Sequence, residues 1–299
     1  LVGPFPEVGI DGVDRRGLDL DEKFVLLGRR SLYLFDREYV SAAVLVVPNG
    51  LHVLPCVGNC QSSVPRTDRG FLRPPVAPTM RCFAHRGFAG ANPENTITAV
   101  RDAAATGADV VEVDVRRCGT GDLVVIHDDT VDRVTDGTGP VADHTLAELR
   151  ALTVLESGAG IPTLDDVYEA LPPDVGVNVE LKERGLATDA LAVASEYDND
   201  TLVSSFEEAT LREADRAGDH SLAYLVGRDT GGQIDRAQSL GCAAIHPHWL
   251  IASADFVARA HEADLTVNAW TVTSREVAAE LARSGVDGLI ADAPAYCRD

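Results

Sequence analysis

The sequence predicts an α/β protein in which residues 80–299 fold as a (β/α)₈ barrel. Three observations support this prediction. From Met80 onward, short strand-like apolar runs alternate with helical patterns. Two of the nine candidate strands are joined by a turn instead of a helix, which leaves eight barrel positions. The length of this part, 220 residues, suits eight strand–helix units.

The candidate strands are short runs rich in β-branched residues. They lie at Cys82–His85, Val110–Val115, Leu123–His127, Val175–Leu181, Thr201–Ser205, Leu222–Val226, Ala243–Ile245, Leu265–Trp270 and Gly288–Ala291. The candidate helices follow most of them, at Thr96–Ala105, Leu164–Leu171, Ala187–Tyr197, Glu207–Ala217, Gln233–Leu240, Ala254–Ala263 and Ser274–Arg283. Repeated strand–helix units imply a parallel sheet with helices outside it.

The second and third strands are separated only by residues 116–122, which read as a hairpin turn. If the turn is centred near Thr120, positions whose numbers sum to about 241 face each other, and Asp114 then faces His127. We therefore expect the third strand to be a returning arm of the second. Residues 128–162 form a small insertion after this arm, with a short helical piece at Thr145–Ala151.

Residues 1–79 form an irregular N-terminal segment in which Pro, Gly and Arg recur. The apolar run Val40–Val47 is too short to span a bilayer and has no signal-peptide pattern, so we expect a cytoplasmic protein without membrane insertion. The only Met of the chain is Met80. Two interpretations stay open: a native start at Met80 with upstream sequence read in frame, or a real N-terminal extension, disordered or irregular.

The six cysteines do not form the pattern of a disulfide framework. Cys56 and Cys60 are close in sequence, but no second Cys/His pair lies at zinc spacing. We therefore expect no structural zinc.

The net charge of −21 is confined to the predicted barrel. Residues 1–79 hold nine basic and nine acidic side chains, whereas residues 80–299 hold 17 basic and 38 acidic ones, and Lys182 is the only Lys among the latter. Such a chain is a poor partner for nucleic acids and anionic membranes, which need a Lys/Arg footprint. A Lys-poor, carboxylate-rich surface is typical of halophilic proteins, because high salt screens its self-repulsion.

Side chains able to do chemistry gather at the predicted strand ends, where a barrel carries its active site. They are His85, Arg86, Glu112, Asp114, His127, Glu180, Lys182 and Trp270. Three carboxylates suit a hard divalent cation, Ca²⁺ or Mg²⁺. Arg86 and Lys182 suit a phosphate, and two His side chains suit general acid–base catalysis. Together they indicate metal-assisted hydrolysis of a small-molecule phosphate ester.

Nine short motifs then carry a family resemblance. They are Ala84-His85-Arg86-Gly87, Pro93-Glu94-Asn95-Thr96, Glu112-Val113-Asp114, Val125-Ile126-His127-Asp128, Pro162-Thr163-Leu164, Glu180-Leu181-Lys182, Ser205-Phe206, Trp270-Thr271-Val272 and the run 285–292. In this order they resemble the glycerophosphodiester phosphodiesterase family, over about 220 residues. One departure, Asp165-Asp166 where the family usually ends an acidic pair in Glu, concerns helix capping.

The resemblance implies a TIM barrel that cleaves glycerophosphodiesters to an alcohol and glycerol phosphate, in lipid and glycerol metabolism, with a cyclic phosphate as a plausible intermediate. It implies His85 and His127 as the acid–base pair. Glu112, Asp114 and Glu180 would hold the metal. Arg86 and Lys182 would hold the phosphate, and Glu94 and Asn95 would line the same pocket. Trp270, at a strand end over the pocket, is either barrel filler or part of the substrate-binding wall. His246 and His248 could border the same pocket, and the sequence leaves the oligomeric state open.

Three alternative functions share parts of this sequence pattern. A phosphodiesterase of the phosphatidylinositol phospholipase C or sphingomyelinase D type would act on lipids, but the chain has no basic or amphipathic membrane-binding stretch. A non-catalytic phosphate-binding barrel predicts a broken set of residues, yet all seven polar ones are present. A different metal-dependent barrel enzyme would not need Arg86 and Lys182 together.

The halophile interpretation predicts activity that rises with salt. The substrate is an anion that must approach a chain of net charge −21, and salt screens that repulsion. The measurement is diesterase activity from low to molar KCl. A fall in activity over this range would contradict the interpretation.

Overall fold

The computed structural model describes residues 80–297 except Asp229, and four strands of the preceding segment. Contacts divide the chain into two units, Leu1–Arg69 and Gly70–Asp299. In the first, β1 (Phe24–Leu27) pairs antiparallel with β2 (Leu32–Phe35), and β3 (Ala42–Val47) with β4 (Gly50–Pro55). Cys56 and Cys60, and with them the zinc question, lie outside the described residues.

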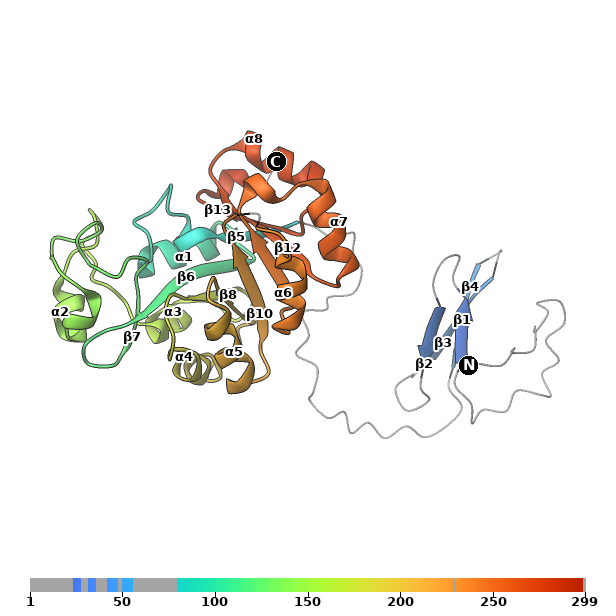
Figure 1. Cartoon of the computed structure of the whole chain (residues 1–299), viewed down its shortest axis with the longest axis horizontal. Coiled ribbons are helices and arrows are strands. Elements are labelled where there is room, and N and C mark those ends of the chain that lie inside the picture. The colour runs from blue at the N-terminus through green and yellow to red at the C-terminus, as the bar shows by residue number, and fades with distance from the viewer. Residues whose placement is uncertain are drawn as a thin grey trace. The chain divides into compact units, whose positions relative to one another are not determined.

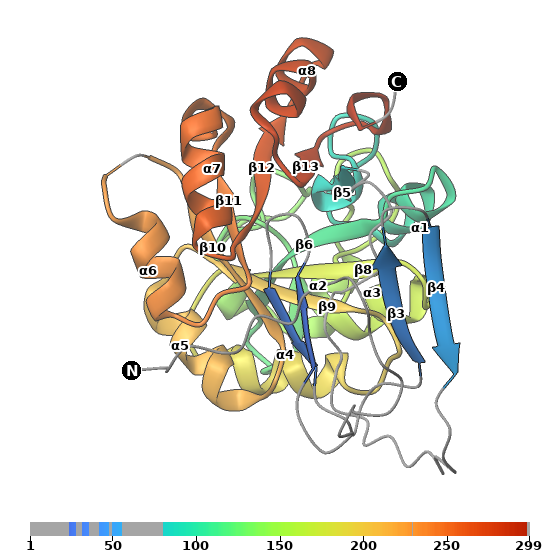
Figure 2. The ribbon, with the colours of Figure 1, turned by 90° about the vertical axis from the view of Figure 1, so that its right-hand side faces the viewer.

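The second unit is a closed barrel of eight parallel strands, as predicted (Figures 1 and 2). In barrel order the strands are β5 (Arg81–Ala84), β6 (Val110–Arg117), β8 (Gly176–Leu181), β9 (Thr201–Ser205), β10 (Ser221–Val226), β11 (Ala244–Pro247), β12 (Thr266–Val272) and β13 (Gly288–Ala291). The last strand, β13, pairs with the first, β5, and β5 also pairs with β6, so the sheet has no open edge in the barrel.

Helices cover the outside of the strands (Figure 2). They are α1 (Ile97–Ala105), α3 (Leu164–Ala170), α4 (Ala187–Ala194), α5 (Glu208–Ala217), α6 (Gln233–Ser239), α7 (Ala254–Glu262) and α8 (Arg275–Ser284). The main core lies between the two layers, and one face of β6 joins it through Val111, Val113 and Val115. The other face of β6, with Glu112 and Asp114, is thereby turned into the barrel, because strand side chains alternate.

The hairpin prediction is confirmed: β7 (Leu123–Val125) returns antiparallel along β6. The predicted register is wrong by one residue. Val115 faces Val125, and the Ile126 N–H donates to the Asp114 carbonyl at 2.9 Å, so Asp114 does not face His127. The turn closes with a hydrogen bond from the Cys118 N–H to the Asp122 carbonyl at 3.0 Å, which centres the loop on Thr120 itself. When the loop is centred on Thr120, the numbers of facing residues sum to 240. A sum of 241 would require the centre of the turn to lie between residues 120 and 121.

The insertion after β7 contains α2 (Leu146–Ala151) (Figure 1). It has its own small apolar core, which includes Val131, Leu149 and Ile161. It rejoins the barrel at α3, where Thr163 and Asp166 form a capping box with bonds of 2.8 and 3.1 Å. The departure at this position therefore does concern capping, as predicted.

A disulfide that the sequence did not predict joins Cys82 on β5 to Cys297 near the C-terminus, with Cα atoms 5.3 Å apart. It links the first barrel strand to the segment that follows the last one. Among the described residues, Cys118 and Cys242 are free and buried. No helix in the described part of the chain is long and apolar enough to cross a membrane.

Candidate active site

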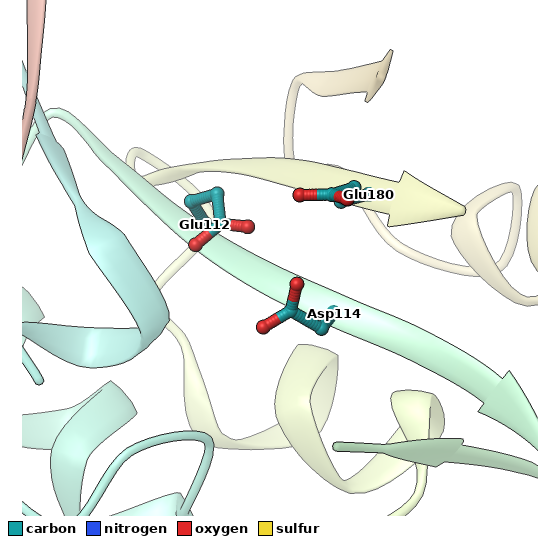
Figure 3. Close-up of side chains that lie close together, drawn as sticks. All are labelled: Glu112, Asp114 and Glu180. Carbon is teal, nitrogen blue, oxygen red and sulfur yellow. The ribbon is translucent and has the colours of Figure 1, made fainter. Parts of the chain in front are cut away.

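Three buried carboxylates meet between two neighbouring strands of the barrel (Figure 3). Glu112 and Asp114 project from β6 and Glu180 from β8, and the register places Asp114 beside Glu180. One oxygen from each lies within 4.8 Å of the others. This brings together the three residues that the sequence proposed as metal ligands.

Burial and neighbouring charges shift the pKa values of this carboxylate triad. Burial and the neighbouring charge of Asp114 raise the pKa of Glu112 to about 8, and the same two causes raise the pKa of Glu180. Burial alone would also raise the pKa of Asp114, but the charges of Lys182 and Arg86 outweigh it and lower that pKa to about 2. A compact set of carboxylate oxygen donors fits a hard divalent cation.

Two cationic side chains contact carboxylates of the triad. The Lys182 ammonium is 2.5 Å from Glu180 Oε1 and 3.3 Å from Asp114 Oδ1. Arg86 Nε is 3.2 Å from Asp114 Oδ2, and the Arg86 backbone N–H donates to Glu112 Oε2 at 2.8 Å. The predicted phosphate-binding groups are therefore held next to the predicted metal ligands.

The turn after β5 explains how Arg86 reaches this place. Arg86 and Gly87 are both in the left-handed region, with φ of 52° and 76°. A Cβ on Gly87 would come within 2.7 Å of the Ala99 Cβ in α1, so the turn needs glycine for both conformation and space. The turn folds the chain back and presents the His85 and Arg86 side chains to the cavity.

The two candidate catalytic histidines each have a carboxylate partner on Nδ1. His85 bonds to Asp292 after β13, and His127 bonds to Asp128, both at 2.6 Å. Burial alone would lower the pKa of His85, but the bond to Asp292 and the charge of Glu112 outweigh it and raise that pKa. Burial dominates at His127 and lowers its pKa. Sequence reasoning gave Asp292 no role, although it ends the last matching motif.

Glu94 and Asn95 hold side chains of the site through hydrogen bonds. The Asn95 side-chain amide donates to Asp114 Oδ2 at 2.9 Å. Glu94 accepts from Arg86 at 2.9 Å and from Arg133, in the insertion, at 2.8 and 2.9 Å. Neither is among the residues that line the cavity, although both contact residues that do.

A cavity of about 150 Å³ opens over the carboxylate triad and has two unlike sides. The polar side is formed by His85, Arg86, Glu112, His127, Asn178, Glu180 and Lys182, and the other side by Phe206, Leu225, Trp270, Thr271 and Ile290. The Trp270 ring N–H donates to the His246 carbonyl at 2.7 Å, so its polar atom is already paired. His246 is completely buried outside this lining, and His248 stands edge-on to Trp270 at 5.2 Å.

The profile of the glycerophosphoryl diester phosphodiesterase family matches residues 85–296. The chain belongs to this family. The match spans the barrel from the turn after β5 to the segment after β13, and it contains every residue of the cavity. The family assignment made from the nine motifs is thereby confirmed.

Relatives of the family cover the same part of the chain. The glycerophosphodiester phosphodiesterase of Caldanaerobacter subterraneus is 33% identical over 71% of this chain and 93% of its own length. The one from Bacillus altitudinis is 30% identical over 72% of this chain and 95% of its own. Among solved structures, an Oleispira antarctica phosphodiesterase in complex with the product sn-glycerol-3-phosphate superposes with a TM-score of 0.67, at 31% identity, over 72% of this chain and 93% of that one.

Adding Ca²⁺ or Mg²⁺ is expected to raise the thermal midpoint of the protein, because a cation that binds only the folded state stabilises it by about 2.7 kcal/mol at a hundred times its Kd. Near neutral pH the cation must displace a proton from Glu112, whose pKa lies at about 8, so affinity should increase as pH rises from 6 to 8. Calorimetric titration at several pH values measures this.

The control compares two carboxylates. Asp114→Asn should abolish the cation effect, whereas Asp255→Asn, which removes an exposed carboxylate that pairs with Arg259, should retain it. Equal cation-induced stabilisation in both variants would show that the triad is not the binding site.

Proposed function

We propose that the protein hydrolyses glycerophosphodiesters to an alcohol and glycerol phosphate. The observation that carries the proposal is one cavity lined by Glu112 and Glu180 of the carboxylate triad, by two cationic side chains and by two carboxylate-bonded histidines, with Asp114 buried beside them. Membership of the family and the product complex of the Oleispira relative support this substrate class. A binding-only role would not require two histidines held in defined orientations.

In this proposal Glu112, Asp114 and Glu180 hold one divalent cation, Ca²⁺ or Mg²⁺. Such a cation would supply Lewis-acid stabilisation of the negative charge that develops on the phosphate. Arg86 and Lys182 bind the non-bridging phosphate oxygens. Their positive charges, which here are paired with Asp114, then face the negative charge that accumulates on the phosphate during displacement.

The opposite pKa shifts of the histidines favour a division of labour. His127, with a lowered pKa, is neutral and accepts the proton of the attacking hydroxyl, from water or from the glycerol itself. His85, whose pKa is raised, keeps its proton to a higher pH than His127 and donates it to the leaving oxygen. A new P–O bond forms as the bond to the alcohol breaks, and one proton is taken up for each one donated. If the glycerol hydroxyl attacks, this step gives a cyclic phosphate, and water then forms a P–O bond as a ring P–O bond breaks, which yields glycerol phosphate.

The apolar side of the cavity has a separate role. Trp270 and Phe206 meet edge to face at 5.4 Å, and the ring N–H of Trp270 is committed to the backbone. This wall has no charge to offer, so it suits the carbon skeleton of the substrate. We infer that it orients the ester relative to the polar side.

Glycerophosphocholine is expected to release glycerol phosphate with the wild-type protein. EDTA should abolish this release, and His127→Ala should reduce kcat by about 10²–10⁴-fold, the usual contribution of a positioned acid or base. His144→Ala removes a half-buried histidine of the insertion, outside the cavity lining, and is the matched control. Activity that survives both EDTA and His127→Ala would refute the mechanism.

A change of leaving group separates the two histidines. A p-nitrophenyl ester needs little protonation of its leaving oxygen, so His85→Ala should lose far less activity on glycerophospho-p-nitrophenol than on glycerophosphocholine. His127→Ala should lose similar factors on both substrates. The reverse pattern would exchange the two roles.

A further inference from the structure

Arg133, near the start of the insertion, contacts two carboxylates, those of Asp128 and Glu94. None of these three residues lines the cavity. Its Nε and one terminal nitrogen lie 2.5 and 3.2 Å from the two oxygens of Asp128. Its two terminal nitrogens lie 2.9 and 2.8 Å from the two oxygens of Glu94. One guanidinium therefore engages both oxygens of two different side chains.

Each of these carboxylates in turn holds a side chain of the cavity. Asp128 bonds to Nδ1 of His127 at 2.6 Å. Because an ionised carboxylate only accepts, this bond places the ring hydrogen on Nδ1 and leaves Nε2 for the substrate. Arg133 keeps Asp128 ionised, since the hydrogen bond from the guanidinium lowers the pKa of that carboxyl far below its usual range.

The second connection leads to the phosphate-binding side. Glu94 accepts from an Arg86 terminal nitrogen at 2.9 Å, while Arg86 Nε points to Asp114 at 3.2 Å. The result is a continuous chain of charged contacts from His127 through Asp128, Arg133 and Glu94 to Arg86. It joins the end of β7 to the turn after β5, two segments that share no strand pairing.

From this geometry we propose that Arg133 is a positioning residue that sets His127 and Arg86 in a common geometry around the substrate phosphate. The proposal rests on the proposed function. Only arginine offers five N–H donors in a planar fork, so a lysine at this place, with three donors on one nitrogen, could not engage both oxygens of both carboxylates. The Arg133 side chain is 47% exposed, and ion pairs this open to solvent add little to stability. Its contribution should therefore be seen in catalysis and not in the free energy of unfolding.

The test compares Arg133→Gln with Arg150→Gln. Arg150 lies in the same insertion, is 51% exposed and pairs with one carboxylate, Asp166, away from the cavity. For Arg133→Gln we expect kcat/KM on glycerophosphocholine to fall about 10–100-fold, the range seen when such supporting contacts are lost, with an unchanged thermal midpoint. Arg150→Gln should match the wild type in both. Arg133→Lys should recover only part of the loss.

Two further variants cut the two connections separately. Asp128→Asn should lower kcat with little change in the affinity for inorganic phosphate, because it acts on His127. Glu94→Gln should mainly weaken phosphate binding, measured by calorimetry and as competitive inhibition, because it acts on Arg86. Arg133→Gln should do both.

Wild-type kcat/KM and phosphate affinity in Arg133→Gln would overturn the proposal, and so would a loss that Arg150→Gln reproduces. If the loss of activity in Arg133→Gln were fully explained by a lower thermal midpoint, Arg133 would have a structural role, and the proposal would be overturned as well. The phosphate calorimetry needs no turnover. If the wild type did not cleave glycerophosphodiesters, the proposed function would fail, while the link from Arg133 to Arg86 would still be tested.

Discussion

Three carboxylates packed between two barrel strands are the constraint on which the rest of this site depends. Burying like charges is costly unless opposite charge lies close by. In this chain the compensation comes from Arg86 after β5 and Lys182 after β8, both within 3.3 Å of Asp114. Because these cations come from the strands on either side of β6, the carboxylates are compensated only once β5, β6 and β8 lie side by side.

Closure of the barrel also brings the two ends of the matched region together. β13 pairs with β5, and this places Asp292 next to His85, 207 residues earlier in the chain. The disulfide between Cys82 and Cys297 joins the same two segments. One of the two candidate catalytic histidines, His85, is thus oriented by a contact that exists only once the last strand has docked.

The other histidine depends on a part of the chain outside the barrel. β7 and the insertion extend from β6, carry His127 and Asp128, and return Arg133 towards Glu94 (Figure 1). The insertion has its own apolar core, so it forms a support that is separate from the barrel layers. Two supports, barrel closure and the insertion, therefore hold the two histidines around one cavity.

Local patterns in the sequence were sufficient for every barrel strand and helix, since periodicity, turn signals and length are local properties. They also identified the triad, because Glu112 and Asp114 share one face of a strand by alternation alone. The predicted register of β7 was wrong by one residue, because the register depends on whether the loop is centred on Thr120 or between two residues. The partners Asp292 and Arg133, the disulfide and the opposite pKa shifts of the histidines were decided only by the tertiary structure. Each arises from charges or sulfur atoms brought together across the fold, and a sequence pattern records spacing along the chain but not distance across it.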